Sequence, residues 1–157
     1  MLLSSVPIIF FKGVSEIFIP SSLVNIGYSE YSEYYAPFAN CSSLKKVTFE
    51  DGIAKIPTHL FESCTGLTNI TIPDTVETIE SYTFNHCTNL KTVILPKSLS
   101  SIEKCAFDSC SALSKIDFPE SLSIIGEEGF QNCTALKKVL FNSELTTLEC
   151  KAFYGCT

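Results

Sequence analysis

Residues 90–112 read LKTVILPKSLSSIEKCAFDSCSA, and the pattern of this segment returns every 23 residues along the chain. Its leading leucine recurs at that interval as Leu44, Leu67, Leu90, Leu113 and Leu136. Two positions keep one residue type in all these repeats: Phe61, Phe84, Phe107, Phe130 and Phe153, and three residues later Cys64, Cys87, Cys110, Cys133 and Cys156. A fixed period of this length with leucine-type spacing predicts a solenoid in which each repeat adds one strand to a parallel sheet.

The same frame divides the whole chain, 1–157, into one array. Five regular repeats are expected, and they span 44–66, 67–89, 90–112, 113–135 and 136–157. An earlier repeat, 14–43, contains the insertion 28–35, and 1–13 fits a degenerate N-terminal half-repeat. The chain stops one residue after Cys156, where the next leucine would begin, so we expect a fragment of a longer array.

Within a repeat, apolar and polar residues alternate as in a strand, so Val93 and Leu95 are expected to point inward and Ile94 outward. Pro96 cannot extend the ladder because it lacks an N–H, and it should end the strand. The next apolar residues, such as Ile102, then return the chain along the opposite wall. The segment Ala-Phe-x-x-Cys is expected to make a tight helical turn that places the Phe in the core.

The full pattern, L-x-x-I-x-φ-P-x-x-φ-x-x-I-x-x-x-A-F-x-x-C, resembles the BspA-like (Treponema pallidum-type) leucine-rich repeat family over residues 14–157. Departures are the insertion 28–35, Glu50 and Asn142 in place of the strand-ending proline, and Leu60, Thr83 and Gly129, where the family favours Ala. The resemblance implies a leucine-rich repeat solenoid with a parallel β-sheet on one face and short extended segments and tight helical turns on the other. It also implies a surface protein of bacteria or parasitic protists that adheres to host proteins or other cells. That implication is associational, since a fold does not fix a function.

Six cysteines form a column in this frame: Cys41, Cys64, Cys87, Cys110, Cys133 and Cys156. Equivalent atoms of stacked repeats lie ~4.8 Å apart with parallel side chains, whereas a disulfide needs facing Cβ atoms ~3.8 Å apart. We therefore predict buried free thiols that behave as small hydrophobes. Cys105 and Cys150 lie outside the column and two repeats apart, too far to pair. A Cys105–Cys110 disulfide is the alternative.

Motifs of catalysis and metal binding are absent from the sequence. It has no G-x-S-x-G, no Gly-rich phosphate loop and no H-E-x-x-H. Its only histidines, His59 and His86, lie in expected surface turns, and its cysteines lack the paired close spacing of zinc sites. The sequence predicts a protein that is not an enzyme and that binds no metal or cofactor.

The amino-acid composition argues against some classes of binding partner. The net charge is −6 and no arginine is present, which argues against nucleic acid. Hydrophobic residues make up 45% and charged residues 18%, as in a packed protein. No stretch approaches the ~20 apolar residues of a membrane helix. The apolar opening, 1–11, is interpreted as part of a core repeat, with a signal peptide as the alternative.

A protein-binding surface is predicted on the outward side of the strands and at the insertion. Lysines gather where the strands begin, and most carboxylates lie beyond the strands. The outward apolar residues are either contact points or scattered surface residues, and the inserted tyrosines either bind a partner or cover the N-terminal core. The candidate residues are Phe18, Tyr28, Tyr31, Tyr34, Tyr35, Lys46, Thr48, Thr71, Ile94, Lys115, Asp117, Lys138 and Leu140.

Two functions fit these features. The first is a protein-binding module of a cell-surface protein, in adhesion or host-protein interaction, whose partner could be a host or extracellular matrix protein. The second is an intracellular structural or scaffold array, which suits the free thiols.

Overall fold

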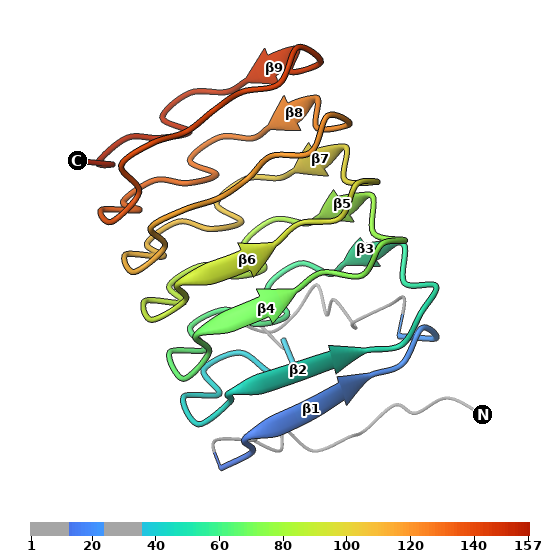
Figure 1. Cartoon of the computed structure of the whole chain (residues 1–157). Helices are drawn as coiled ribbons and strands as arrows, with labels where there is room; N and C mark the ends of the chain where they lie inside the picture. The colour runs from blue at the N-terminus through green and yellow to red at the C-terminus, as the bar shows by residue number, and fades with distance from the viewer. Residues whose placement is uncertain (1–12, 24–35) are drawn as a thin grey trace, which may run out of the picture.

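The computed structural model of the chain describes residues 13–23 and 36–157, which wind into a parallel β-solenoid (Figure 1). Every assigned strand pairing is parallel, as the 23-residue period predicts. The strands of this part of the chain are β1 (Glu16–Ile19), β2 (Lys46–Phe49), β3 (Lys55–Ile56), β4 (Asn69–Thr71), β5 (Thr78–Ile79), β6 (Thr92–Ile94), β7 (Ser101–Ile102), β8 (Ile124–Ile125) and β9 (Thr147–Leu148).

The most regular sheet lies on the back wall, where the sequence predicted only short extended segments. Strands β3, β5, β7, β8 and β9 form one continuous five-stranded sheet with a single short strand from each repeat. In three of the four pairs the isoleucines stand opposite one another, as Ile79 does to Ile102 and Ile102 to Ile125, and these three are fully buried; in the last pair Ile125 stands opposite Leu148. The back wall therefore ties all five regular repeats together.

The front wall, where the sequence predicted the sheet, is paired only in parts. β1 pairs with β2 and β4 pairs with β6, and beyond β6 the structure assigns a single bridge, between Thr92 and Lys115. Each interruption lies beside a repeat with a phenylalanine at the end of this wall: Phe49, Phe118 or Phe141. The rings of Phe118 and Phe141 stack with centroids 6.2 Å apart, more than the ~4.8 Å of paired strands. Aromatic rings thus accompany the interruptions at the front, although Phe49 itself stands opposite Ile19 in the β1–β2 pair.

The predicted helical turns are wrong in detail, because no helix is assigned in residues 13–23 and 36–157. Two residues in each turn, such as Cys105 (φ 52°) and Ser109 (φ 59°), have left-handed backbone angles that a right-handed helix cannot contain. Their N–H groups point to the next repeat: Cys105 donates to the Glu127 carbonyl at 2.9 Å and Ser109 to the Gln131 carbonyl at 2.8 Å. The turns form a third wall of inter-repeat hydrogen bonds, called here the turn wall.

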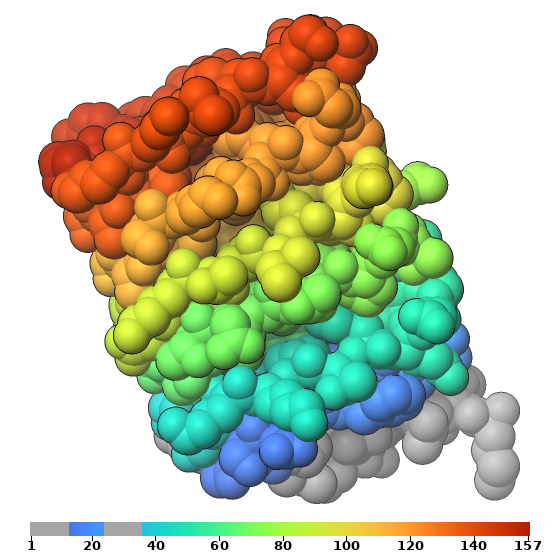
Figure 2. Space-filling view, viewed as in Figure 1, coloured from blue at the N-terminus to red at the C-terminus, as the bar shows by residue number. Residues whose placement is uncertain are grey.

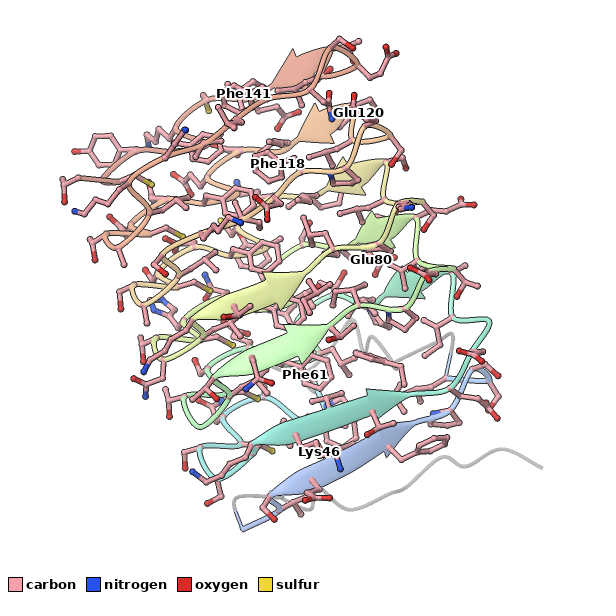
Figure 3. The ribbon with its side chains drawn as sticks, viewed as in Figure 1. Lys46, Phe61, Glu80, Phe118, Glu120 and Phe141 are labelled. Atoms are coloured by element: carbon pink, nitrogen blue, oxygen red, sulfur yellow. The ribbon has the colours of Figure 1, made fainter. Side chains whose placement is uncertain are left out.

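Phenylalanines from successive turns form the predicted column in the core. The rings of Phe84, Phe107 and Phe130 stack at centroid distances of 5.2 Å and 5.1 Å, with their planes within 14° of parallel. All three side chains are fully buried. Figure 3 labels Phe61, which continues the same column toward the N-terminus at 5.6 Å from Phe84. The column fixes the spacing of the repeats from inside.

The cysteine column is also confirmed, with a contact that the sequence did not reveal. All eight cysteines are free thiols, and the alternative Cys105–Cys110 disulfide is not formed. Five thiols of the column, from Cys64 to Cys156, donate to the carbonyl of a phenylalanine in the preceding repeat, as Cys110 Sγ does to Phe84 at 3.2 Å. Burial raises the pKa of the Cys64 thiol to about 12 and that of Cys110 well above its ordinary value. The thiols are therefore neutral donors inside the core.

We expect Phe107→Ala to lower the free energy of unfolding by about 3–5 kcal/mol, because neighbouring repeats cannot collapse into the cavity it leaves. Phe141→Ala is the matched control, since its ring is 49% exposed, and it should cost clearly less. Chemical denaturation of both variants measures the two losses. Equal losses would show that the column does not carry the core.

Thiol titration of the native protein should detect Cys150 first, because it alone is classed as exposed. The hydrogen bond to Glu127 raises the pKa of Cys150, so its reaction should be slow near neutral pH and accelerate as pH rises. Cys156, half-buried, should react later, and the other six thiols only after denaturation. The variant Cys150→Ser should lose the fast phase; a fast phase that persists in it would contradict the assignment.

Candidate protein-binding face

The outward side of the front wall, called here the front face, carries a line of side chains at equivalent positions. Register places Phe18 directly beside Thr48, and Thr71 directly beside Ile94. Phe18, Ile94 and Leu140 are 59%, 56% and 69% exposed, although all three are large and apolar. The structure thus brings together the predicted outward residues, which are Phe18, Thr48, Thr71, Ile94, Asp117 and Leu140.

Lysines border this line at the edge where the front segments begin. Lys46 Nζ lies 3.8 Å from Glu16, and Lys115 Nζ lies 2.7 Å from Asp117. These four side chains are exposed, so each pair contributes ~1 kcal/mol or less and is easily exchanged for a partner's charge. The exposed lysines of this basic edge are Lys45, Lys46, Lys91, Lys115, Lys137 and Lys138.

Carboxylates collect at the opposite edge, where the front segments end. Glu50 accepts hydrogen bonds from the Ser21 hydroxyl at 2.6 Å and the Ser21 N–H at 2.7 Å, and these bonds lower the pKa of Glu50. Glu120 lies in the corner after residues 115–118 (Figure 3) and is exposed. The front face is consequently polarised, with an apolar line between a basic and an acidic edge.

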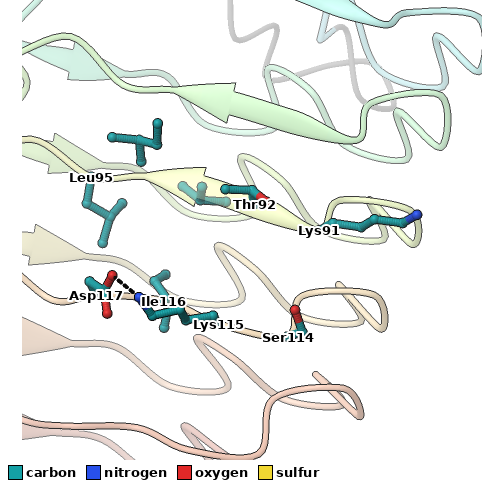
Figure 4. A pocket seen from close by; sticks show the side chains of 9 residues that line it. Lys91, Thr92, Leu95, Ser114, Lys115, Ile116 and Asp117 are labelled. Carbon is teal, nitrogen blue, oxygen red and sulfur yellow. Dashed lines mark ion pairs between the residues drawn. The ribbon is translucent and has the colours of Figure 1, made fainter.

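A shallow groove of about 270 Å³ opens on the front face between residues 91–95 and 114–117 (Figure 4). Figure 2 shows the hollow between these two stretches. Leu95 is only half-buried there, whereas Ile72, its equivalent in the preceding repeat, is 2% exposed. The groove was not predicted from the sequence, because the repeat pattern implies that the front strands of all repeats pair in the same way. The available signal was Phe118, an aromatic ring where the two preceding repeats carry Ile72 and Leu95.

The remaining candidates, Tyr28, Tyr31, Tyr34 and Tyr35, lie outside the residues that the structure describes. Their role in binding stays a prediction.

Carboxylates of the back and turn walls mostly brace neighbouring repeats. Lys104 Nζ lies 2.5 Å from Glu127, and Lys151 Nζ lies 3.2 Å from Glu128. Glu80 accepts hydrogen bonds from Lys55 at 2.6 Å and from the Thr58 N–H at 3.0 Å. Burial acts to raise the pKa of Glu80, but these bonds outweigh it and the pKa is lowered. The acidic back is therefore partly a structural brace.

We expect Glu80→Gln to lower stability by about 0.5–1 kcal/mol at neutral pH, because a partly exposed ion pair is lost. The lowered pKa means that the contribution of Glu80 is present above its ordinary value of 4.5 and is lost as pH falls through the folded-state value. Denaturation curves of wild type and variant should thus converge in acid. Glu77→Gln, in an exposed carboxylate of the same repeat, is the control. A difference that does not shrink below pH 4.5 would contradict the linkage.

The described residues hold neither a cluster placed to bind a metal ion nor a helix able to cross a membrane. In residues 13–23 and 36–157, no group of three or more His, Cys, Asp and Glu side chains is placed to hold a metal ion. His59 Nδ1 lies 2.7 Å from Glu62, and its ring stacks on Tyr82 with centroids 4.7 Å apart. The same residues contain no helix with the length and hydrophobicity to cross a membrane.

Solved structures with this architecture come from several bacteria. A leucine-rich repeat protein of T. pallidum, TpLRR, is 30% identical, with a TM-score of 0.68 over 72% of this chain and 54% of that one. A leucine-rich repeat protein of Bacteroides ovatus is 33% identical, with a TM-score of 0.62 over 64% and 26%. A leucine rich cell surface protein of Faecalibacterium prausnitzii is 30% identical, with a TM-score of 0.53 over 79% and 38%.

The chain thus spans only 26% to 54% of the length of these three proteins. No curated protein matches it significantly. The BspA type leucine rich repeat region matches residues 34–157 in six copies. Together with the solenoid and its neighbours of known structure, this match shows that the chain belongs to the BspA-type leucine-rich repeat family.

Proposed function

We propose that this chain is the protein-binding repeat module of a cell-surface protein, and that it acts in adhesion to host or extracellular matrix proteins. The observation that carries the proposal is the front face, where exposed apolar side chains lie beside a basic edge. Exposed large apolar side chains on one face can serve as separate contact points for a partner that spans several repeats, and Thr48, Thr71 and Asp117 lie between them here. Phe18, Ile94 and Leu140 each present most of their surface to solvent, and the alternation that exposes Phe18 and Ile94 buries their neighbours Ile19 and Val93.

The family also favours this function. A repeat solenoid offers an extended surface on which a partner can contact several repeats at once. The structurally similar protein of Faecalibacterium prausnitzii is a cell surface protein. Location at the surface and a role in adhesion are what we infer for this chain from that similarity.

An intracellular scaffold is the second candidate, and the eight free thiols favour it. Oxidising compartments usually convert paired cysteines to disulfides. However, the column thiols point in parallel toward phenylalanine carbonyls, as Cys87 Sγ does toward Phe61 at 3.1 Å. This geometry keeps them from pairing in any compartment, so the thiols are compatible with both locations. Labelling intact cells with an impermeant biotin reagent distinguishes the two candidates.

The proposal predicts that the chain binds at least one of a panel of purified extracellular matrix proteins through the front face. The triple variant Phe18→Ser, Ile94→Ser, Leu140→Ser should weaken that binding at least about tenfold, because exposed apolar anchors supply much of the binding energy. Biolayer interferometry measures the change.

The matched control is Ile124→Ser, which removes an exposed isoleucine from β8 on the back wall and should leave binding unchanged. Equal losses in the triple variant and the control would contradict a front-face site. Absence of binding across the whole panel would refute adhesion to matrix proteins.

A further inference from the structure

The groove at residues 91–95 and 114–117 marks a place where two repeats separate at the front but stay joined elsewhere. On the back wall, β7 and β8 pair in full register. On the turn wall, the Phe107 N–H donates to the Gly129 carbonyl at 2.8 Å. At the front, the only assigned pairing between these stretches is the bridge from Thr92 to Lys115, whereas β4 and β6 pair through three residues. The opening is therefore held in place by two intact walls.

The groove combines an aliphatic side with a basic end. Ile94 and Leu95 supply the aliphatic side, and Leu95 is less buried than its equivalent Ile72. Lys91 and Lys115 belong to the end where the segments begin. Figure 4 shows the Lys91 side chain pointing outward at that end and the Lys115 side chain reaching along the groove to Asp117. No salt bridge to Lys91 is found among the described residues. Two cations against one carboxylate leave the lining of the groove with a net positive charge.

The groove is shallow and can take side chains of a peptide. At about 270 Å³ it lies at the lower limit of the roughly 300–1,000 Å³ of most small-molecule sites, and this volume has room for one or two side chains. It lies between two front segments whose pairing is limited to Thr92 and Lys115. An extended segment lying on the front face can therefore place a side chain in it.

We propose that this groove binds an extended, acidic segment of the partner protein, with an apolar side chain seated against Ile94 and Leu95 and flanking carboxylates on Lys91 and Lys115. The proposal rests on the proposed function, since it names the kind of partner segment that the front face takes. Charge complementarity decides the occupant: the basic end attracts carboxylates, and the exposed Lys115–Asp117 pair exchanges at little cost.

The test uses the whole chain and the fluorescein-labelled peptide Glu-Glu-Leu-Glu-Glu. Fluorescence anisotropy should show saturable binding that weakens as salt is added, because exposed charges are screened. The peptides Glu-Glu-Ala-Glu-Glu and Gln-Gln-Leu-Gln-Gln should each bind at least about tenfold more weakly, since one lacks the apolar anchor and the other the carboxylates. Equal binding of all three peptides would overturn the proposal, as would binding of none.

Charge-reversal variants test whether the peptide binds in the groove. The double variant Lys91→Glu, Lys115→Glu should reduce affinity at least about tenfold. The control Lys97→Glu reverses an exposed lysine of the same repeat beyond Pro96 and should change affinity little. All three substitutions are at exposed positions, and melting curves check that the fold is kept. Equal losses in variant and control would mean that only net charge matters, and would overturn the groove site.

The outcome is separable from that of the proposed function. Matrix-protein binding that depends on Phe18 and Leu140 but not on Lys91 and Lys115 would refute the groove and leave the proposed function standing. Peptide binding in the groove without any matrix partner would refute adhesion to matrix proteins and keep the groove as a peptide site. Sedimentation of the free chain tests a second copy as the occupant: dimers abolished by Lys91→Glu, Lys115→Glu would overturn the assignment to a separate partner.

Discussion

The inter-repeat backbone hydrogen bond is the constraint on which this solenoid depends. Each repeat buries backbone groups that only its neighbours can satisfy, and buried N–H and C=O groups must be paired. Pairing on two walls at once, through Ile102 on the back and Cys105, Phe107 and Ser109 on the turn wall, requires every repeat to follow the same path. One residue more or fewer between Ile102 and Ser109 would misalign one wall against the other. The need to pair backbone groups on both walls explains why the repeats keep a strict length of 23 residues.

Two intact walls leave the third free to vary. The front wall pairs between the repeats of Ile72 and Leu95 and between those of Ile19 and Phe49, and its ladder stops beside Phe118. Phe118 also packs on Phe130, with centroids 5.6 Å apart, so two aromatic rings share the space within one repeat. Beside this ring pair the front segments separate while the back sheet stays paired. A groove can therefore arise at little cost to the fold.

The stacking of repeats also determines which features of the structure could be predicted from the sequence. The phenylalanine and cysteine columns could be predicted because identical residues at a fixed period must stack. The helical turn could not be corrected from sequence, because Cys105 and Ser109 are ordinary residues whose left-handed angles are imposed by bonds to the next repeat. The outward line Phe18 to Leu140 followed from alternation alone. The groove did not, because it depends on the distance between two segments, and a repeat pattern describes each segment separately.

Specificity must reside where the repeats differ. The leucine, phenylalanine and cysteine columns hold one residue type in the regular repeats and are mostly buried, so they stabilise the array and are not accessible to a partner. The outward positions of the front wall carry a different chemistry in most repeats: aromatic at Phe18, hydroxyl at Thr48 and Thr71, aliphatic at Ile94 and acidic at Asp117. These side chains, together with the groove between residues 91–95 and 114–117, determine which surface is complementary to the front face. Recognition by this chain is therefore a property of the order of its repeats as well as of their composition.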